Sequence, residues 1–217
     1  AQFVLHRGLI IAVVQLIFSM IFYFSAIPIF TGLVAVGYTC VYTSLPVITL
    51  LLDRDVSAEA ALYYPELYHS LQKGSSLNNK TFLSWVIRSF FQGSVIMWIS
   101  MLLFETEFHN IMNITFTALI LTELVNVILE VKKWHYLMVL SEIGSVLIYF
   151  GSILIPIYEV QSKFDTNFIL SPEFWWKSAV VTAASTIPIA IAKVSIKWFN
   201  PSAHMKLRGV KTKNSYD

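Results

Sequence analysis

Ionisable and amide side chains interrupt the long apolar stretches of this sequence, and they are its first candidates for chemistry. Glu123, Asn126 and Glu130 recur at spacings of three and four residues, so they share one face of a helix. Arg88 and Glu142 lie in two other apolar stretches, where Arg88 is expected to extend its charge toward water and Glu142 is a candidate neighbour of Glu123. Such groups either relay ions or protons through a membrane or hold helices together, and both interpretations stay open.

A second group of polar side chains precedes a proline. Four hydroxyl-bearing residues stand just before Pro46: Thr39, Tyr42, Thr43 and Ser44. Proline removes a backbone hydrogen bond and clashes with the preceding turn. The released carbonyls and the hydroxyls can solvate a polar substrate at mid-membrane depth. Alternatively, the hydroxyls satisfy the released carbonyls themselves, and the proline only bends the helix.

Recognisable catalytic motifs are absent from the sequence. It has no phosphate-binding glycine loop, no HExxH string and one cysteine, Cys40, which excludes paired-cysteine metal sites. We therefore expect no catalytic residue, no metal site and no cofactor bound by this chain. The net charge of +2 does not favour a nucleic-acid partner. The chain does not begin with Met, and we expect it to be part of a longer protein.

Lipid is the expected solvent of this chain. It is 56% hydrophobic and 13% charged, against about 25% charged residues in soluble domains. Residues 1–200 are predicted to form an all-α membrane domain, a six-helix transmembrane bundle, followed by a cytosolic tail at 201–217. A two-residue turn, Phe30-Thr31, joins the first two spans. The six predicted spans are Gly8–Ile29, Gly32–Leu52, Phe82–Phe104, Ile111–Val131, Tyr136–Tyr158 and Phe174–Lys197.

Basic residues predict the orientation of the bundle. One face would carry only Lys163 and Lys177, and the other face eleven lysines and arginines, so the second face is expected to be cytosolic. Both termini and the polar loop 53–80 would then lie in the cytosol. The eleven residues are Arg7, Arg54, Lys73, Lys80, Lys132, Lys133, Lys197, Lys206, Arg208, Lys211 and Lys213.

One block of the sequence, Tyr42–Lys80, carries several motifs in a fixed order. The strings are YTSLP, DRDVS, YPELY, LQKG and NNKTF. This order resembles the P4-type ATPases, the phospholipid flippases, and the resemblance extends over all six spans, which would be that family's fifth to tenth membrane helices. The strings QFVLHRGLIIAVVQ, LLFETEFHNI and ILTEL resemble its Neo1p-like branch.

The resemblance implies the membrane part of an ATP-driven enzyme. Such an enzyme would move phosphatidylserine and phosphatidylethanolamine from the lumenal to the cytosolic leaflet of Golgi and endosomal membranes. Its ATP and Mg²⁺ would bind to cytosolic domains that this chain lacks, together with the first four membrane helices. These missing parts and membrane lipids are the expected partners. The alternative is a non-enzymatic six-span scaffold or channel subunit.

Two sets of site residues follow from the resemblance and from the residue types. A headgroup path between the first two spans would use His6, Arg7, Thr39, Tyr42, Thr43, Ser44 and Pro46, with Arg7 beside the lipid phosphate. Arg7 could instead only anchor its helix at the interface. Coupling to the cytosolic domains would use Asp53, Arg54 and Asp55, unless the loop only braces the bundle.

Two departures from the flippase pattern bear on the headgroup path. Many members have Lys-Asn where this chain has His6-Arg7, and many have an asparagine where it has Thr39. The lipid headgroup that this protein prefers can therefore differ from that of flippases with the usual residues. The predicted outer loops are short, which leaves little surface for an accessory subunit of the usual interface size, about 800 Å² per partner. We expect none, as the Neo1p-like resemblance also implies.

Overall fold

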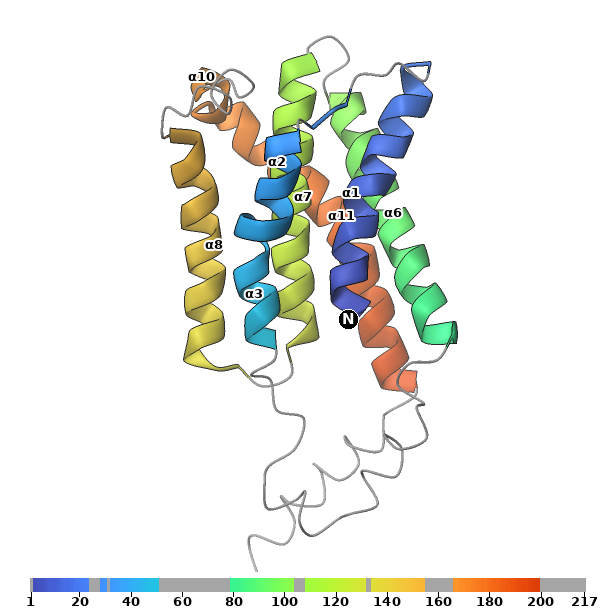
Figure 1. Cartoon of the computed structure of the whole chain (residues 1–217). Helices are drawn as coiled ribbons and strands as arrows, with labels where there is room; N and C mark the ends of the chain where they lie inside the picture. The colour runs from blue at the N-terminus through green and yellow to red at the C-terminus, as the bar shows by residue number, and fades with distance from the viewer. Residues whose placement is uncertain are drawn as a thin grey trace, which may run out of the picture.

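The computed structural model describes residues 2–23, 28–30, 32–50, 79–103, 108–131, 134–154 and 166–199. All regular structure in these ranges is helical, which confirms the predicted all-α class (Figure 1). The elements are α1 (Gln2–Ile21), α2 (Gly32–Val36), the π-helical turn η1 (Gly37–Tyr42), α3 (Ser44–Thr49), α6 (Asn79–Leu103), α7 (Phe108–Glu130), α8 (Tyr136–Leu154), α10 (Thr166–Ile169) and α11 (Pro172–Phe199).

Five described helices are long and apolar enough to cross a membrane: α1, α6, α7, α8 and α11. The remaining predicted span, Gly32–Leu52, is second along the chain and is divided into α2, η1 and α3. Its apolar stretch Val34–Thr49 is shorter than the five long helices. The division coincides with Pro46, because proline cannot donate the backbone hydrogen bond that a continuous helix needs.

The first helix differs from its prediction at both ends. Predicted at Gly8–Ile29, it begins at Gln2 and ends at Ile21, followed by Tyr23 at a φ of 52°. The predicted two-residue turn at Phe30-Thr31 is therefore wrong, because the connection to α2 starts at residue 22. Hydropathy does not register where a backbone leaves the helix when the connecting residues are themselves apolar.

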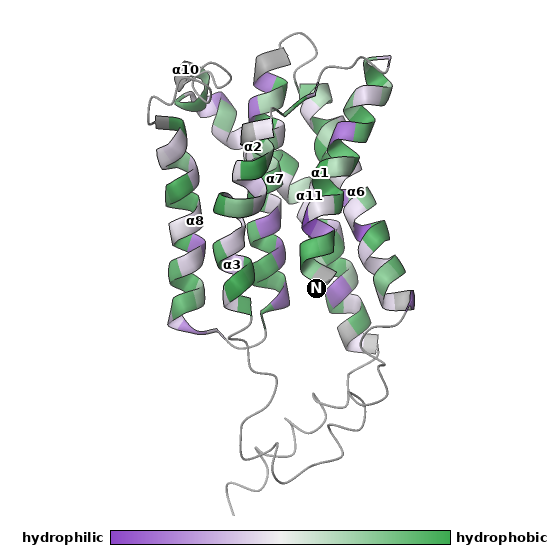
Figure 2. Cartoon of the chain, viewed as in Figure 1, coloured by the Kyte–Doolittle hydropathy of each residue, from purple (hydrophilic) through white to green (hydrophobic). Residues whose placement is uncertain are grey.

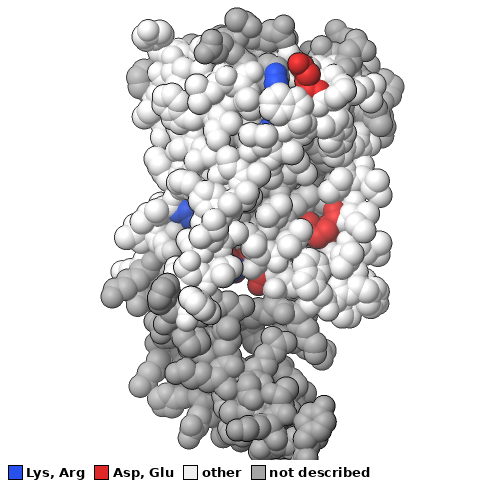
Figure 3. Space-filling model, turned by 180° about the vertical axis from the view of Figure 1, so that it is seen from behind, with Lys and Arg blue, Asp and Glu red and all other residues white. Residues whose placement is uncertain are grey.

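α7 is the central helix of the described bundle. About 83% of its membrane-spanning window is buried, against 22–33% for the other four long helices. α1 and α6 pack side by side on one flank, α8 packs on α3 and η1 on the other, and α11 crosses obliquely between them (Figure 1). The outward surfaces of these helices are mostly hydrophobic (Figure 2), and the back of the bundle shows only scattered charged groups (Figure 3).

A glycine sets the closest contact between helices α1 and α6. A Cβ atom on Gly93 would lie 2.9 Å from both Cβ and Cγ1 of Val13 and 3.1 Å from the carbonyl oxygen of Ile10. Real Cβ atoms essentially never approach so closely, so only glycine fits. The two backbones can therefore approach closely, as small residues allow in membrane bundles.

The helices alternate in direction. α1, α6 and α8 begin at the lower face of Figure 1, and α3, α7 and α11 end there. The described chain thus starts and finishes on one face.

Candidate substrate path and buried polar network

The break before Pro46 is closed by hydroxyl side chains. The Thr43 hydroxyl donates a hydrogen bond to the carbonyl oxygen of Tyr38 at 2.6 Å, and the Ser44 hydroxyl donates to that of Thr39 at 2.7 Å. Both bonds span five residues, which matches the wider π-helical turn. The hydroxyls therefore bond within their own helix, as the kink interpretation expects, but their acceptors are not the carbonyl of Tyr42, the one that Pro46 itself leaves without its usual donor. This bonding leaves the acceptor lone pairs of these hydroxyls for another partner.

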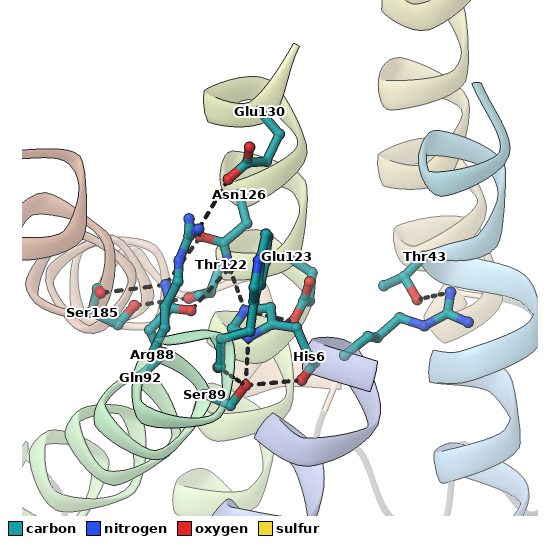
Figure 4. A network of polar contacts seen from close by, with 12 residues as sticks. His6, Thr43, Arg88, Ser89, Gln92, Thr122, Glu123, Asn126, Glu130 and Ser185 are labelled. Atoms are coloured by element: carbon teal, nitrogen blue, oxygen red, sulfur yellow. Dashed lines mark hydrogen bonds and ion pairs between the residues drawn. The ribbon is translucent and has the colours of Figure 1, made fainter. Parts of the chain in front are cut away.

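Arg7 is that partner. It lies in α1, half-buried, and its Nη1 donates to Oγ1 of Thr43 at 3.1 Å and to Oγ of Ser44 at 3.4 Å (Figure 4). The hydroxyl of Tyr38 in turn donates to the carbonyl oxygen of Arg7 at 3.4 Å. Three residues of the predicted headgroup path therefore meet where α1 faces the break between η1 and α3.

The other predicted path residues lie elsewhere around this junction. The hydroxyl of Thr39 donates back to its own helix, to the carbonyl oxygen of Ala35 at 3.2 Å. The hydroxyl of Tyr42 shares a hydrogen bond of 2.9 Å with Ser152 on α8. Pro46 is buried. These contacts bind the broken helix to α8 and give no direct contact with Arg7.

His6 belongs to a different cluster, on α1 but directed toward α6 and α7. It is fully buried, whereas the sequence predicts it on a headgroup path beside Arg7. Its Nδ1 is hydrogen-bonded to Oγ of Ser89, and its Nε2 lies 3.2 Å from Nδ2 of Asn126 (Figure 4). Asn126 also exchanges two hydrogen bonds with the side-chain amide of Gln92, at 3.0 and 3.1 Å. His6 thus connects α1 to a polar layer inside the bundle.

Arg88 is held within the protein, and its predicted extension toward water is wrong. Its side chain is 14% exposed, and its Nη1 donates to Oε1 of Glu130 at 3.0 Å. Its Nη2 donates to Oδ1 of Asn126 at 3.3 Å, and the guanidinium stands 4.9 Å from the ring centre of Trp85. Lys193 of α11 approaches the same Glu130 oxygen at 2.9 Å.

The two remaining embedded carboxylates do not pair with each other. Glu123 lies 3.8 Å from Nε2 of His6 and is 1% exposed. Glu142 stands on α8, which packs chiefly against α3 and η1. The predicted Glu123–Glu142 neighbourhood is therefore replaced by a contact between Glu123 and His6.

We call the buried and half-buried polar groups shared by these helices the polar layer: His6, Arg88, Ser89, Gln92, Thr122, Glu123, Asn126, Glu130, Ser185 and Lys193. The sequence did not indicate five of them, which are Ser89, Gln92, Thr122, Ser185 and Lys193. Gln92 follows Arg88 by four residues and Ser89 by three, a spacing that would have identified Gln92 as a neighbour of both. Thr122 and Ser185 share a hydrogen bond of 2.9 Å between α7 and α11. The polar layer joins α1, α6, α7 and α11.

Several expected features lie outside the described residues. Asp53, Arg54 and Asp55, the rest of the polar loop to residue 78, and the tail 201–217 are among them. Within the described part of the chain, no group of three or more histidine, cysteine or acidic side chains could hold a metal ion.

A bundle of apolar helices of this length is that of a multi-pass membrane protein. The chain belongs to the family of phospholipid-translocating P-type ATPases, because the family's C-terminal region matches residues 1–202. This membership favours a transporter over the scaffold or channel alternative.

The similar proteins carry matching names. A zebrafish (Danio rerio) "probable phospholipid-transporting ATPase IIB" is 45% identical over 95% of this chain and 18% of its own length. The "probable phospholipid-transporting ATPase tat-5" of Caenorhabditis elegans is 43% identical over 95% of this chain and 19% of its own. The Saccharomyces cerevisiae "phospholipid-transporting ATPase NEO1" is 37% identical over 96% and 18%. The chain spans about a fifth of these relatives.

Proposed function

We propose that this chain is the membrane part through which an ATP-driven flippase moves aminophospholipids, phosphatidylserine and phosphatidylethanolamine, from the lumenal to the cytosolic leaflet. Family membership and the names of the relatives support transport of phospholipids. ATP and Mg²⁺ would bind outside this chain, in domains joined to the first four membrane helices. The chain itself would supply part of the lipid path.

The contact of Arg7 with Thr43 and Ser44 carries the proposal. Both hydrogen bonds from the guanidinium to hydroxyls use Nη1. Nη2 and Nε can then donate to a phosphate in the paired geometry that guanidinium groups provide. A lipid headgroup passing the broken helix would meet this cation beside the half-buried Ser44. A lipid phosphate would thus find both charge and hydrogen-bond donors within the membrane.

Substitution of Arg7 in the full-length enzyme tests this path. Arg7→Leu removes a charge-assisted hydrogen bond of about 1.5–3 kcal/mol, equivalent to about 10- to 100-fold in transport efficiency. Arg7→Lys keeps the charge but loses the paired donors, so we expect an intermediate loss. The measurement is uptake of fluorescent phosphatidylserine, phosphatidylethanolamine and phosphatidylcholine. Val4→Leu, on an exposed part of the same helix, is the control.

The headgroup preference decides between transport and anchoring. If Arg7→Leu is made in normal amounts and transports all three lipids at the rate of the unaltered enzyme, Arg7 only anchors α1 and the proposed path is wrong. Thr43→Val provides a second variant, because it removes the hydroxyl that faces Arg7 and keeps the shape of the side chain. We expect it to weaken transport in the same lipid order.

We further propose that the lower face of Figure 1 is cytosolic, with both termini on it. Eleven predicted cytosolic cations support this orientation. In cells whose plasma membrane alone is permeabilised, added protease should then cleave a tag after Asp217, whereas a lumenal tag would be cleaved only after detergent opens the internal membranes. Golgi and endosomal membranes, and operation without an accessory subunit, are expected from the Neo1-like relatives. Fractionation and co-purification of the tagged enzyme test both.

Asp53 and Asp55 are proposed to couple this bundle to the cytosolic domains, with Arg54 between them. The two acids follow the apolar end of the broken span and offer hydrogen-bond acceptors to a docking surface. Replacing both with Asn in the full-length enzyme should reduce ATP hydrolysis stimulated by lipid while leaving expression normal. Unchanged stimulation would show that the loop only braces the bundle.

A further inference from the structure

Glu123 is a buried carboxyl group that lacks a hydrogen-bond partner. Its side chain is 1% exposed, and neither Oε1 nor Oε2 has a donor among the described residues. Nε2 of His6 lies 3.8 Å from Oε1, beyond the range of a hydrogen bond (Figure 4), and the Tyr38 hydroxyl is a second polar neighbour of this carboxyl group. An ionised carboxylate in such a place costs several kcal/mol unless it is paired. Either Glu123 is uncharged in this conformation or another group must compensate its negative charge.

Hydrogen bonding around His6 assigns the neutral imidazole. Arg88 can only donate, so the Asn126 atom it meets is the carbonyl oxygen, and the amide nitrogen of Asn126 must donate to Nε2 of His6. The Ser89 hydroxyl donates to the carbonyl oxygen of Trp85 at 2.9 Å and so accepts from Nδ1 of His6. The proton of His6 is on Nδ1, and Nε2 is an acceptor. His6 brings no positive charge to Glu123.

The cations near Glu123 are engaged elsewhere. Arg7 of α1 is bound to hydroxyl groups, and Arg88 of α6 and Lys193 of α11 are both bound to Glu130. The hydroxyl of Tyr38 in η1 also faces Glu123, but its proton is donated to the carbonyl oxygen of Arg7 at 3.4 Å. The other ionisable residues of these elements and of α8 are Cys40, Tyr42, Lys80, Tyr136, Glu142, Tyr149, Glu173, Lys177 and Lys197.

We propose that Glu123 is a proton-binding site in the core of the bundle, occupied in this conformation, with His6 positioned to take the proton. Transfer would break the O–H bond of Glu123 and form an N–H bond at Nε2, leaving a carboxylate beside an imidazolium. Nε2 would then exchange Asn126 for Glu123 as its partner. The transfer requires α1 and α7 to move closer than the present 3.8 Å, or Asn126 to withdraw.

A proton fits this site better than a metal ion. The side chains around Glu123 present one imidazole nitrogen that is already hydrogen-bonded, and the described residues hold no group of three ligands. The proposal does not depend on which lipid the enzyme moves.

Infrared spectroscopy of the full-length enzyme in nanodiscs tests the proton directly. A protonated carboxyl group has a C=O stretch that is separate from the two bands of a carboxylate. At neutral pH, Glu123→Gln should remove intensity from the protonated band, whereas the control Glu173→Gln, whose side chain is 67% exposed, should remove carboxylate intensity. Loss of carboxylate intensity in Glu123→Gln would overturn the proposal. If Glu123→Gln does not fold, Glu123→Asp should shift the protonated band, and an unchanged band would likewise refute it.

The pH dependence of unfolding is an independent measure. A group protonated in the folded protein and ionised when exposed to water loses its stabilising effect as the pH rises, by up to tenfold in the unfolding equilibrium per pH unit. Exposed carboxyl groups are ionised above about pH 6. When the pH is raised from about 6 to about 8, the thermal midpoint of the unaltered enzyme should therefore decrease more than that of Glu123→Gln. Parallel falls in the two proteins would contradict proton binding at Glu123.

Discussion

The ion pair between Arg88 and Glu130 makes a measurable contribution to the stability of the bundle. Arg88→Leu removes a charge-assisted hydrogen bond, worth about 1.5–3 kcal/mol. We take the lower value, because Glu130 is 27% exposed and keeps Lys193 at 2.9 Å. Loss of the contact with the ring of Trp85, at 4.9 Å, adds about 0.5–1 kcal/mol. The expected cost is thus about 2 kcal/mol.

A double-mutant cycle separates this pair from its surroundings. Thermal unfolding of the full-length enzyme in detergent is measured for Arg88→Leu, Glu130→Gln and both together. We expect the double variant to be more stable than the sum of the single effects by about 1 kcal/mol, because each single change already removes the bond between the two side chains. Additive effects within about 0.5 kcal/mol would refute the pairing and restore the interpretation in which Arg88 reaches water. If Arg88 reaches water, Arg88→Lys should also leave the stability of the enzyme unchanged.

Two further changes test packing around α6 and α7. Gly93→Ala should destabilise the bundle by about 1–3 kcal/mol, because the new methyl group meets Val13 at 2.9 Å. Gly144→Ala, with no atom within 4 Å of its Cβ, should be neutral or stabilising by up to about 1 kcal/mol, and equal thermal midpoints for the two would contradict the close helix contact. Tyr149→Phe should cost about 1 kcal/mol by removing a buried hydrogen bond of 2.6 Å to α7, whereas Tyr136→Phe, at a residue 72% exposed, should leave the midpoint unchanged.

Hydropathy located most of the membrane helices but not the geometry of the first two. α6, α7, α8 and α11 begin at or slightly before their predicted starts, since polar residues bound them. The first span was displaced toward the C-terminus because Phe22 and Tyr23 are apolar yet lie beyond the helix. The proline at 46 revealed that the second span is broken. It could not reveal that the break takes the form of a π-helical turn, because that depends on how Thr43 and Ser44 bond.

Polar residues were easier to recognise than to pair. The sequence identified Arg88, Glu123 and Glu130 as costly groups in apolar helices. It could not show that Arg88 and Glu130 meet across two helices, because periodicity orders residues within one helix only. His6 was interpreted as part of the headgroup path, since Arg7 follows it directly. Adjacent residues on a helix point about 100° apart, and here His6 faces α6 and α7 whereas Arg7 faces the break between η1 and α3.

The deep burial of α7 bears on the order in which the helices are made. Ribosomes release α1 and α6 before α7, and α8 and α11 after it. On leaving the translocon, α7 carries Glu123 and Asn126, which lipid cannot solvate. α1 and α6 are already present and supply His6 and Gln92. Ser185 and Lys193 arrive only with α11. An unfinished chain that stops before α11 would expose Thr122 and Glu130 to the bilayer, a signal by which membrane quality control can recognise it.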